Sequence, residues 1–154
     1  MAYDALLEEA EKYGAEVLEN SRMRKFSGLC VGNVIVINKN LNQNEKTCVL
    51  AEELGHYLVT VGNILDQTKT ENRKQEFIAR RWAVRKLIRL EDLFKAYKAG
   101  VRDKAELAEF LNVTEQFLDM AIEHFKNIYG LYCRFGNYII GFDPLMLYKR
   151  IEGE

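Results

Sequence analysis

The sequence predicts a mainly helical α+β fold, and three observations support that prediction. Helical spacing of apolar residues recurs through most of the 154 residues. Two β-rich runs each surround a Gly-Asn pair, at Gly32-Asn33 and Gly136-Asn137, which is typical of a tight hairpin. The chain shows no internal repeat or low-complexity tract, so its length suits one ordinary domain, or one domain with a small appendage.

The composition excludes several classes of protein. Hydrophobic residues make up 48% of the chain, which is enough for a core, and the net charge is only -1. That balance argues against a strongly basic nucleic-acid-binding protein and against one that binds anionic membranes. The N-terminal residues are acidic and amphipathic, unlike a signal peptide, and no apolar run reaches the ~20 residues of a membrane span. The three cysteines lack the C-x-x-C spacing of a metal or redox site. We therefore expect a cytoplasmic protein with free thiols.

The N-terminal part of the chain predicts a helix, a hairpin and a second, longer helix. Residues 3–19 carry apolar side chains at helical spacing with charged residues between them. The runs Gly28–Val31 and Val34–Ile37 form the two strands of the first hairpin. Asn42, with a glutamate three residues later, matches a capping box, so the longer helix should begin there and run to about Thr60.

The longer helix should pack closely against the helix that follows it. Its expected core face consists of Leu50, Leu54, Tyr57, Leu58 and Val61. Residues 61–70 read as a connection, and the next helix should begin at about Glu71. Along that helix Glu76, Ala79 and Ala83 share a face. Because the alanines are small, the two helix backbones could approach closely there.

The C-terminal part predicts three short helices and a second hairpin. A helix over residues 91–99 ends at Gly100, and residues 103–126 read as a helix, a turn and another helix. The runs Tyr132–Phe135 and Tyr138–Phe142 form the hairpin, and the tail after it is polar.

Residues 105–126 are close to a helix-turn-helix pattern, which makes DNA binding one hypothesis for the chain. Charge argues against it. The second helix carries Glu115, Asp119 and Glu123 against the single lysine Lys126, so DNA phosphates would repel it. We expect the motif to pack internally or to hold a protein partner rather than nucleic acid.

The clearest chemistry lies in Cys48–Leu58, read together with Glu76. Glu52 and His56 are one helical turn apart and point the same way, and Glu53 is adjacent to both. Zinc proteases use this geometry in the motif H-E-x-x-H, where the residues four apart bind the metal and the intervening glutamate is the general base. Here a glutamate stands where that motif has its first histidine. Glu52, His56 and Glu76 would be the three metal ligands and Glu53 the general base of a zincin-like helical core.

Each of these residues also has a structural interpretation. A Glu-Glu pair followed by a histidine is often a solvated helix face, and Glu76 could pair with Arg80 one turn later. His124, the other histidine, more commonly has a packing or surface role than a ligand role. Cys48 lies one turn before Glu52 and could supply a thiolate ligand, although a buried thiol is the commoner state.

The joint pattern resembles the ImmA/IrrE family of metallopeptidases. Ala51–His56 matches that family's H-E-[LI]-[GA]-H except at its first histidine, and Glu76–Ala83 matches its E-x-x-A-x-x-[FW]-A. The first hairpin and the segment Gly62–Asp66 also match. The resemblance implies a metallopeptidase-like domain over residues 1–90. Residues 91–154 would then be a C-terminal helical segment with a β-hairpin, similar in its larger part to the phage and mobile-element branch of the family.

Family membership would imply an intracellular, zinc-dependent endopeptidase. Such proteins often act as anti-repressors of a prophage or mobile element, and the implied protein substrate is therefore a repressor-type transcription regulator. Position by position, the resemblance implies that Glu53 is the general base, that His56 and Glu76 are the second and third ligands, and that Glu52 replaces the first.

The glutamate at position 52 changes the expected metal chemistry. Two carboxylates and a neutral imidazole cancel the charge of a divalent ion, which makes it a poorer Lewis acid. Oxygen ligands also shift preference from Zn²⁺ toward Mn²⁺ or another hard divalent ion. We expect metal to bind more weakly than at a two-histidine site. The competing hypothesis is a metal-free relative that acts as a protein-binding module on the repressor.

Overall fold

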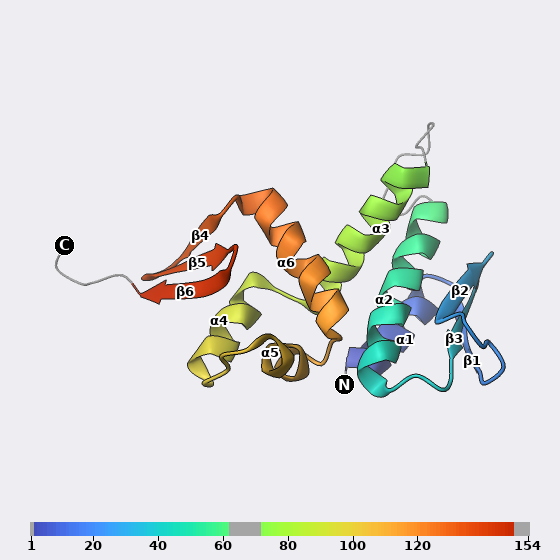
Figure 1. Cartoon of the computed structure of the whole chain (residues 1–154). Helices are drawn as coiled ribbons and strands as arrows, with labels where there is room; N and C mark the ends of the chain where they lie inside the picture. Colours follow the sequence, from blue (N-terminus) through green and yellow to red (C-terminus); the bar gives the residue numbers. More distant parts are fainter. Residues whose placement is uncertain (1, 62–71, 150–154) are drawn as a thin grey trace. The chain divides into compact units, whose positions relative to one another are not determined.

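The computed structural model describes residues 2–61 and 72–149 (Figure 1). The chain divides into two compact units, Met1–Leu87 and Ile88–Glu154. The expected start of a helix at Glu71 and the segment Gly62–Asp66 lie outside the described residues, as does nearly all of the connection expected at 61–70. Within the described ranges, none of the helices combines the length and apolar character of a membrane span.

The first unit packs helices on a small sheet. Its described elements are α1 (Ala2–Lys12), β1 (Glu16–Asn20), β2 (Gly28–Val31), β3 (Val34–Asn38), α2 (Gln43–Thr60) and α3 (Asn72–Leu87). The central strand β3 pairs with β1 in parallel and with β2 antiparallel. Its alternate residues Ile35 and Ile37 are fully buried, and α2 packs against β2 and β3. The first predicted hairpin is thus confirmed as β2 and β3.

The prediction of one helix over residues 3–19 is wrong in its second half. The helix α1 ends at Lys12 because Gly14 adopts a φ of +85°, and the Ala15 N–H then donates to the Ala10 carbonyl at 2.9 Å. After this turn, Glu16–Asn20 pairs with Val34–Asn38 as the strand β1. The residues that continue the helical spacing are therefore extended, and their partner strand lies later in the chain.

The helix α2 matches its predicted start and length. The Asn42 side chain accepts the Glu45 N–H at 2.9 Å, and the Glu45 carboxylate accepts the Asn42 N–H at 3.0 Å, which completes the capping box. Four of the five predicted core residues are buried: Leu50, Leu54, Tyr57 and Leu58. The fifth, Val61, is 46% exposed, because it is the C-cap residue beyond the last turn.

The second unit contains a helix-turn-helix and another sheet. Its described elements are α4 (Leu90–Lys98), α5 (Lys104–Leu111), α6 (Glu115–Tyr129), β4 (Tyr132–Phe135), β5 (Tyr138–Phe142) and β6 (Leu145–Lys149). Asn112 ends α5 in the left-handed region at a φ of 58°, and the Thr114 hydroxyl caps α6. The predicted mainly helical α+β class and second hairpin are confirmed.

The residues expected to form a polar tail instead include a third strand. The strand β6 pairs antiparallel with β5, from Tyr138 opposite Lys149 to Phe142 opposite Leu145. Leu145 and Leu147 alternate with more exposed residues along it. The prediction failed because the alternation is short: only Met146 separates the two leucines, and the charged Lys149 and Arg150 follow Tyr148.

Candidate metal centre

The two helices that carry the predicted site residues approach closely at a glycine. A Cβ atom placed on Gly55 of α2 would lie 2.5 Å from the Ala79 carbonyl oxygen of α3, far inside van der Waals contact. Ala79 and Ala83 are completely buried along the same contact. The predicted role of the alanines is therefore confirmed, and Gly55 is the residue on α2 that makes the approach possible.

This approach brings His56 and Glu76 together from different helices. The His56 Nε2 atom lies 3.2 Å from the Glu76 Oε2 atom. The other carboxylate oxygen of Glu76 accepts a hydrogen bond from Arg80 Nε at 3.1 Å, so the expected Glu76–Arg80 pair also forms. Both side chains are partly open to solvent, at 32% for His56 and 43% for Glu76. The arrangement leaves the imidazole and a carboxylate oxygen accessible at a common point.

Glu52 and Glu53 lie beside this pair on α2 and are partly buried. Burial is the main cause that raises the pKa of Glu52 above its usual value. The charge of Arg80 opposes this rise, and the charge of Glu53 adds to it. Burial likewise raises the pKa of Glu53, where His56 opposes the rise and the Glu76 carboxylate adds to it. Both carboxyl groups therefore hold a proton more readily than an exposed glutamate.

The edge strand β2 forms a wall next to Glu53. A Cβ atom on Gly28 would lie 3.2 Å from Glu53 Cγ and 2.5 Å from Val49 Cγ1, so only glycine fits between this strand and α2 without displacing a neighbour. Burial raises the pKa of the Cys30 thiol, and the charge of Glu53 adds to the rise. The strand, the glutamate and the His56–Glu76 pair thus belong to one region of the first unit.

Comparison with protein families decides the assignment of this region. The family model of the IrrE N-terminal-like domain, Peptidase_M78, matches residues 10–123. The chain belongs to the Peptidase_M78 family. Neither the curated proteins nor the solved structures contain a match to it. Peptidase_M78 membership confirms the ImmA/IrrE resemblance and makes the chain a metallopeptidase of the IrrE type by family.

The Peptidase_M78 assignment implies a divalent metal ion, and two of the expected ligands fit one. Two ligand atoms at tetrahedral positions around a single zinc ion are about 3.4 Å apart, close to the 3.2 Å between His56 Nε2 and Glu76 Oε2. The described residues do not place a third ligand beside these two. Across residues 2–61 and 72–149, no three His, Cys, Asp or Glu side chains are grouped closely enough to hold an ion. The geometry therefore fits two of the three ligands that a catalytic zinc requires.

The other two possible metal ligands, Cys48 and His124, are buried. Cys48, one turn before Glu52, is only 4% exposed, as the structural interpretation of a buried thiol requires. His124 belongs to the second unit, where it is 8% exposed on α6 and its ring lies 5.7 Å from that of Phe125. Sequence reasoning missed Gly28 and Gly55. Gly28 gives a weak signal, as a glycine at the start of a strand. Gly55 lies inside a helix, where glycine is disfavoured unless a backbone must approach closely, and it occupies the small-residue position [GA] of the family motif.

Proposed function

We propose that this Peptidase_M78 chain is a metal-dependent endopeptidase whose metal ligands are Glu52, His56 and Glu76 and whose general base is Glu53. The single observation that best supports the proposal is the convergence of His56 and Glu76 from two helices, at 3.2 Å between Nε2 and Oε2. Glu52 lies on the same helix as His56, one turn earlier, and is the candidate for the third ligand.

The proposed chemistry is hydrolysis of a peptide bond by a water molecule. A divalent cation, when bound, polarises the peptide carbonyl and makes water more acidic. Glu53 then accepts the proton of the attacking water and later donates it to the leaving amine. Burial raises the pKa of the Glu53 carboxyl, which brings it closer to neutral pH and suits a group that both accepts and donates a proton.

The identity of the metal follows from the donor set. Glu52 and Glu76 contribute two carboxylates and His56 one imidazole, a more oxygen-rich set than two histidines and one carboxylate. We infer a site that takes Zn²⁺ weakly and Mn²⁺ comparatively well. Charge neutralisation by the second carboxylate lowers Lewis acidity, so we infer slow turnover as well.

We further propose that the substrate is a repressor-type transcription regulator, the partner that the ImmA/IrrE resemblance implies. The test is to co-produce the chain with the repressor encoded by the neighbouring gene and to measure intact repressor by mass spectrometry. Wild type should yield two repressor fragments, and Glu53→Gln none. Glu11→Gln, which removes a charge from the exposed face of α1, should cleave like wild type. Equal cleavage by Glu53→Gln would eliminate the peptidase mechanism.

A metal-free binding module is the second candidate function. It is supported by the lack of a three-ligand group in the described residues. Such a module would relieve repression by holding the repressor, which would stay intact. Loss of repression with full-length repressor, in both wild type and Glu53→Gln, would therefore establish binding in place of cleavage.

Direct DNA binding is the third and weakest hypothesis. The α5–α6 pair has the helix-turn-helix form, but Glu115, Asp119 and Glu123 are exposed on α6 and Lys126 pairs with Asp143 at 2.9 Å. An acidic helix face would repel phosphates. A shift of duplex DNA in a gel that weakens with added salt would revive this hypothesis.

A further inference from the structure

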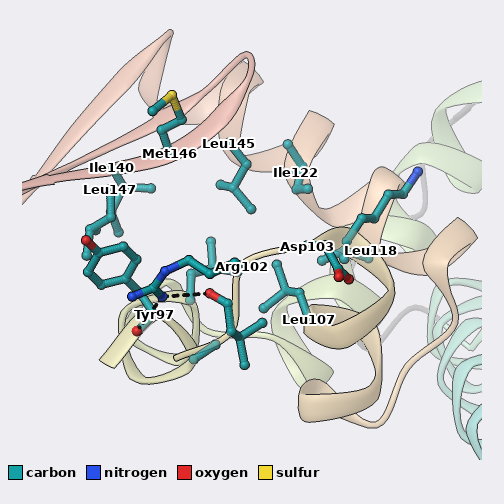
Figure 2. Close-up of a pocket in the computed structure, with 14 residues that line it drawn as sticks. Tyr97, Arg102, Asp103, Leu107, Leu118, Ile122, Ile140, Leu145, Met146 and Leu147 are labelled. Carbon is teal, nitrogen blue, oxygen red and sulfur yellow. Dashed lines mark hydrogen bonds between the residues drawn. The ribbon is translucent and has the colours of Figure 1, made fainter. Parts of the chain in front are cut away.

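The second unit contains a cavity of about 600 Å³ that the peptidase function does not use. Its residues all lie between Leu93 and Leu147, so it belongs to this unit alone. Figure 2 shows side chains of α4 and α5 on one side and of β5 and β6 on the other, with Ile122 and Leu118 of α6 beside them. Pockets of about 300–1,000 Å³ commonly enclose small molecules.

The walls of this cavity are apolar. Leu93, Ala96, Leu107, Leu118 and Ile140 line it and are each 7% exposed or less, and Ile122, Leu145 and Leu147 complete the surface. None of these side chains can form a hydrogen bond. The interior therefore suits the hydrocarbon part of a ligand.

Polar residues line the cavity along the chain from the end of α4 to the start of α5. They are Tyr97 on α4, Arg102 and Asp103 in the connection, and Lys104 at the start of α5, all of them exposed. Two of these charges are already engaged. Lys104 Nζ lies 2.6 Å from the Asp119 carboxylate, and the Asp103 carboxylate accepts the Glu106 N–H at 2.8 Å as the cap of α5.

Arg102 differs from its neighbours because its partners are neutral. Its Nη1 donates to the Tyr97 and Val101 carbonyls, both at 2.9 Å, and its guanidinium carbon lies 4.3 Å from the centre of the Tyr97 ring. In the described part of the chain, no carboxylate lies within ion-pair distance of it. The carbonyls and the ring hold the guanidinium in place while other N–H groups remain for an anion.

We propose that this cavity binds an apolar molecule that carries one carboxylate, with its hydrocarbon part among the buried leucines and its carboxylate at Arg102. A planar guanidinium matches a carboxylate in geometry as well as charge. The ligand gains from burial of apolar surface and from an ion pair with a cation that is already positioned, so little ordering is required on binding. A neutral or cationic molecule of the same length lacks the second interaction.

The test uses the full-length protein, with decanoate as the probe and decanol as its neutral counterpart, each titrated by calorimetry. One decanoate should bind per chain, and at least about tenfold more tightly than decanol, as expected for a charged hydrogen bond. Arg102→Gln should abolish that preference while leaving decanol affinity unchanged. Arg134→Gln, an exposed arginine on β4 outside the cavity, is the matched control and should retain the preference.

A second measurement locates the ligand without altering the chain. The buried Ile140 side chain lines the cavity, whereas Ile35 belongs to the first unit. With isoleucine δ1 methyl groups labelled with carbon-13, decanoate should shift the Ile140 signal and leave that of Ile35 unchanged. The proposal is overturned if decanoate does not bind, if Arg102→Gln keeps the preference for decanoate, or if both isoleucine signals shift equally.

Discussion

Replacement of Gly55 by alanine should force α2 and α3 apart at the point on which the candidate site depends. The new Cβ would lie 2.5 Å from the Ala79 oxygen and 3.1 Å from the Ala79 carbonyl carbon, both of them backbone atoms that cannot rotate away. An ordinary contact requires about 1 Å more. The helices must therefore separate by roughly that amount, and His56 Nε2 would move away from Glu76 Oε2 from the present 3.2 Å.

Two opposing terms set the expected change in stability. Alanine is favoured over glycine within a helix by about 1 kcal/mol. Overpacking costs about 1–3 kcal/mol, and a backbone neighbour places this case at the upper end. We expect Gly55→Ala to lower the free energy of unfolding by about 2 kcal/mol. Urea denaturation followed by the fluorescence of Trp82, the one tryptophan in the chain, reports on α3 directly.

A control on the same helix separates packing from helix propensity. Asn44→Ala lies in the first turn of α2, away from the close approach, and should change stability by less than about 0.5 kcal/mol. Gly55→Ala should also weaken divalent metal binding at least about tenfold, because the two helices carry different ligands. A Gly55→Ala protein as stable as wild type, with undiminished metal affinity, would refute the close-approach argument.

Two further predictions concern single glutamates. Glu52→His restores the two-histidine donor set, so it should raise Zn²⁺ affinity by about tenfold or more relative to Mn²⁺ affinity. Competition with a chelator measures both affinities, and an unchanged preference between the two ions would contradict the assignment of Glu52 as a ligand. The hydrogen bond from Lys46 is the main cause that lowers the pKa of the Glu19 carboxyl, and the hydrogen bond from Tyr3 contributes less. A carboxyl whose pKa is lowered by folding stabilises the protein at pH values above its usual pKa, and this stabilisation is lost as the pH falls through the lowered pKa. Glu19→Gln should therefore be less stable than wild type near pH 7, by about 0.5–1 kcal/mol because solvent screens this exposed carboxylate. Urea titrations at falling pH should show the difference closing as the Glu19 carboxylate becomes protonated; a constant difference would show that the ionised carboxylate is not the cause.

Local signals in the sequence were sufficient for much of the fold. The Asn42–Glu45 capping box identified the start of α2, and the two Gly-Asn pairs identified both hairpins. Pairing between strands that are distant in the sequence could not be predicted. The strand β1 continues the apolar spacing of α1, and after the turn at Gly14 its parallel pairing with β3, across an intervening turn and strand, keeps it extended. For the same reason, the short alternation in β6 gave no signal strong enough to separate a strand from a polar tail.

The sequence likewise predicted part of the candidate site. Spacing alone placed Glu52, Glu53 and His56 on one side of a helix, and the shared face of Glu76 and Ala79 indicated the second helix. The contact between these helices depends on Gly55 meeting the Ala79 carbonyl. Contacts between backbones of separate segments leave no periodic pattern in a sequence, so periodicity alone does not identify this glycine.

Equilibrium dialysis of the untagged protein against Mn²⁺ and Zn²⁺, with bound metal counted by mass spectrometry, tests the central claim most directly. If α2 and α3 form a metallopeptidase centre, wild type will bind one ion per chain, and His56→Ala and Glu76→Gln will each lose it. The matched variant Glu91→Gln, on α4 in the second unit, will bind like wild type. Absence of bound metal in wild type, or binding that survives loss of both His56 and Glu76, would contradict the account.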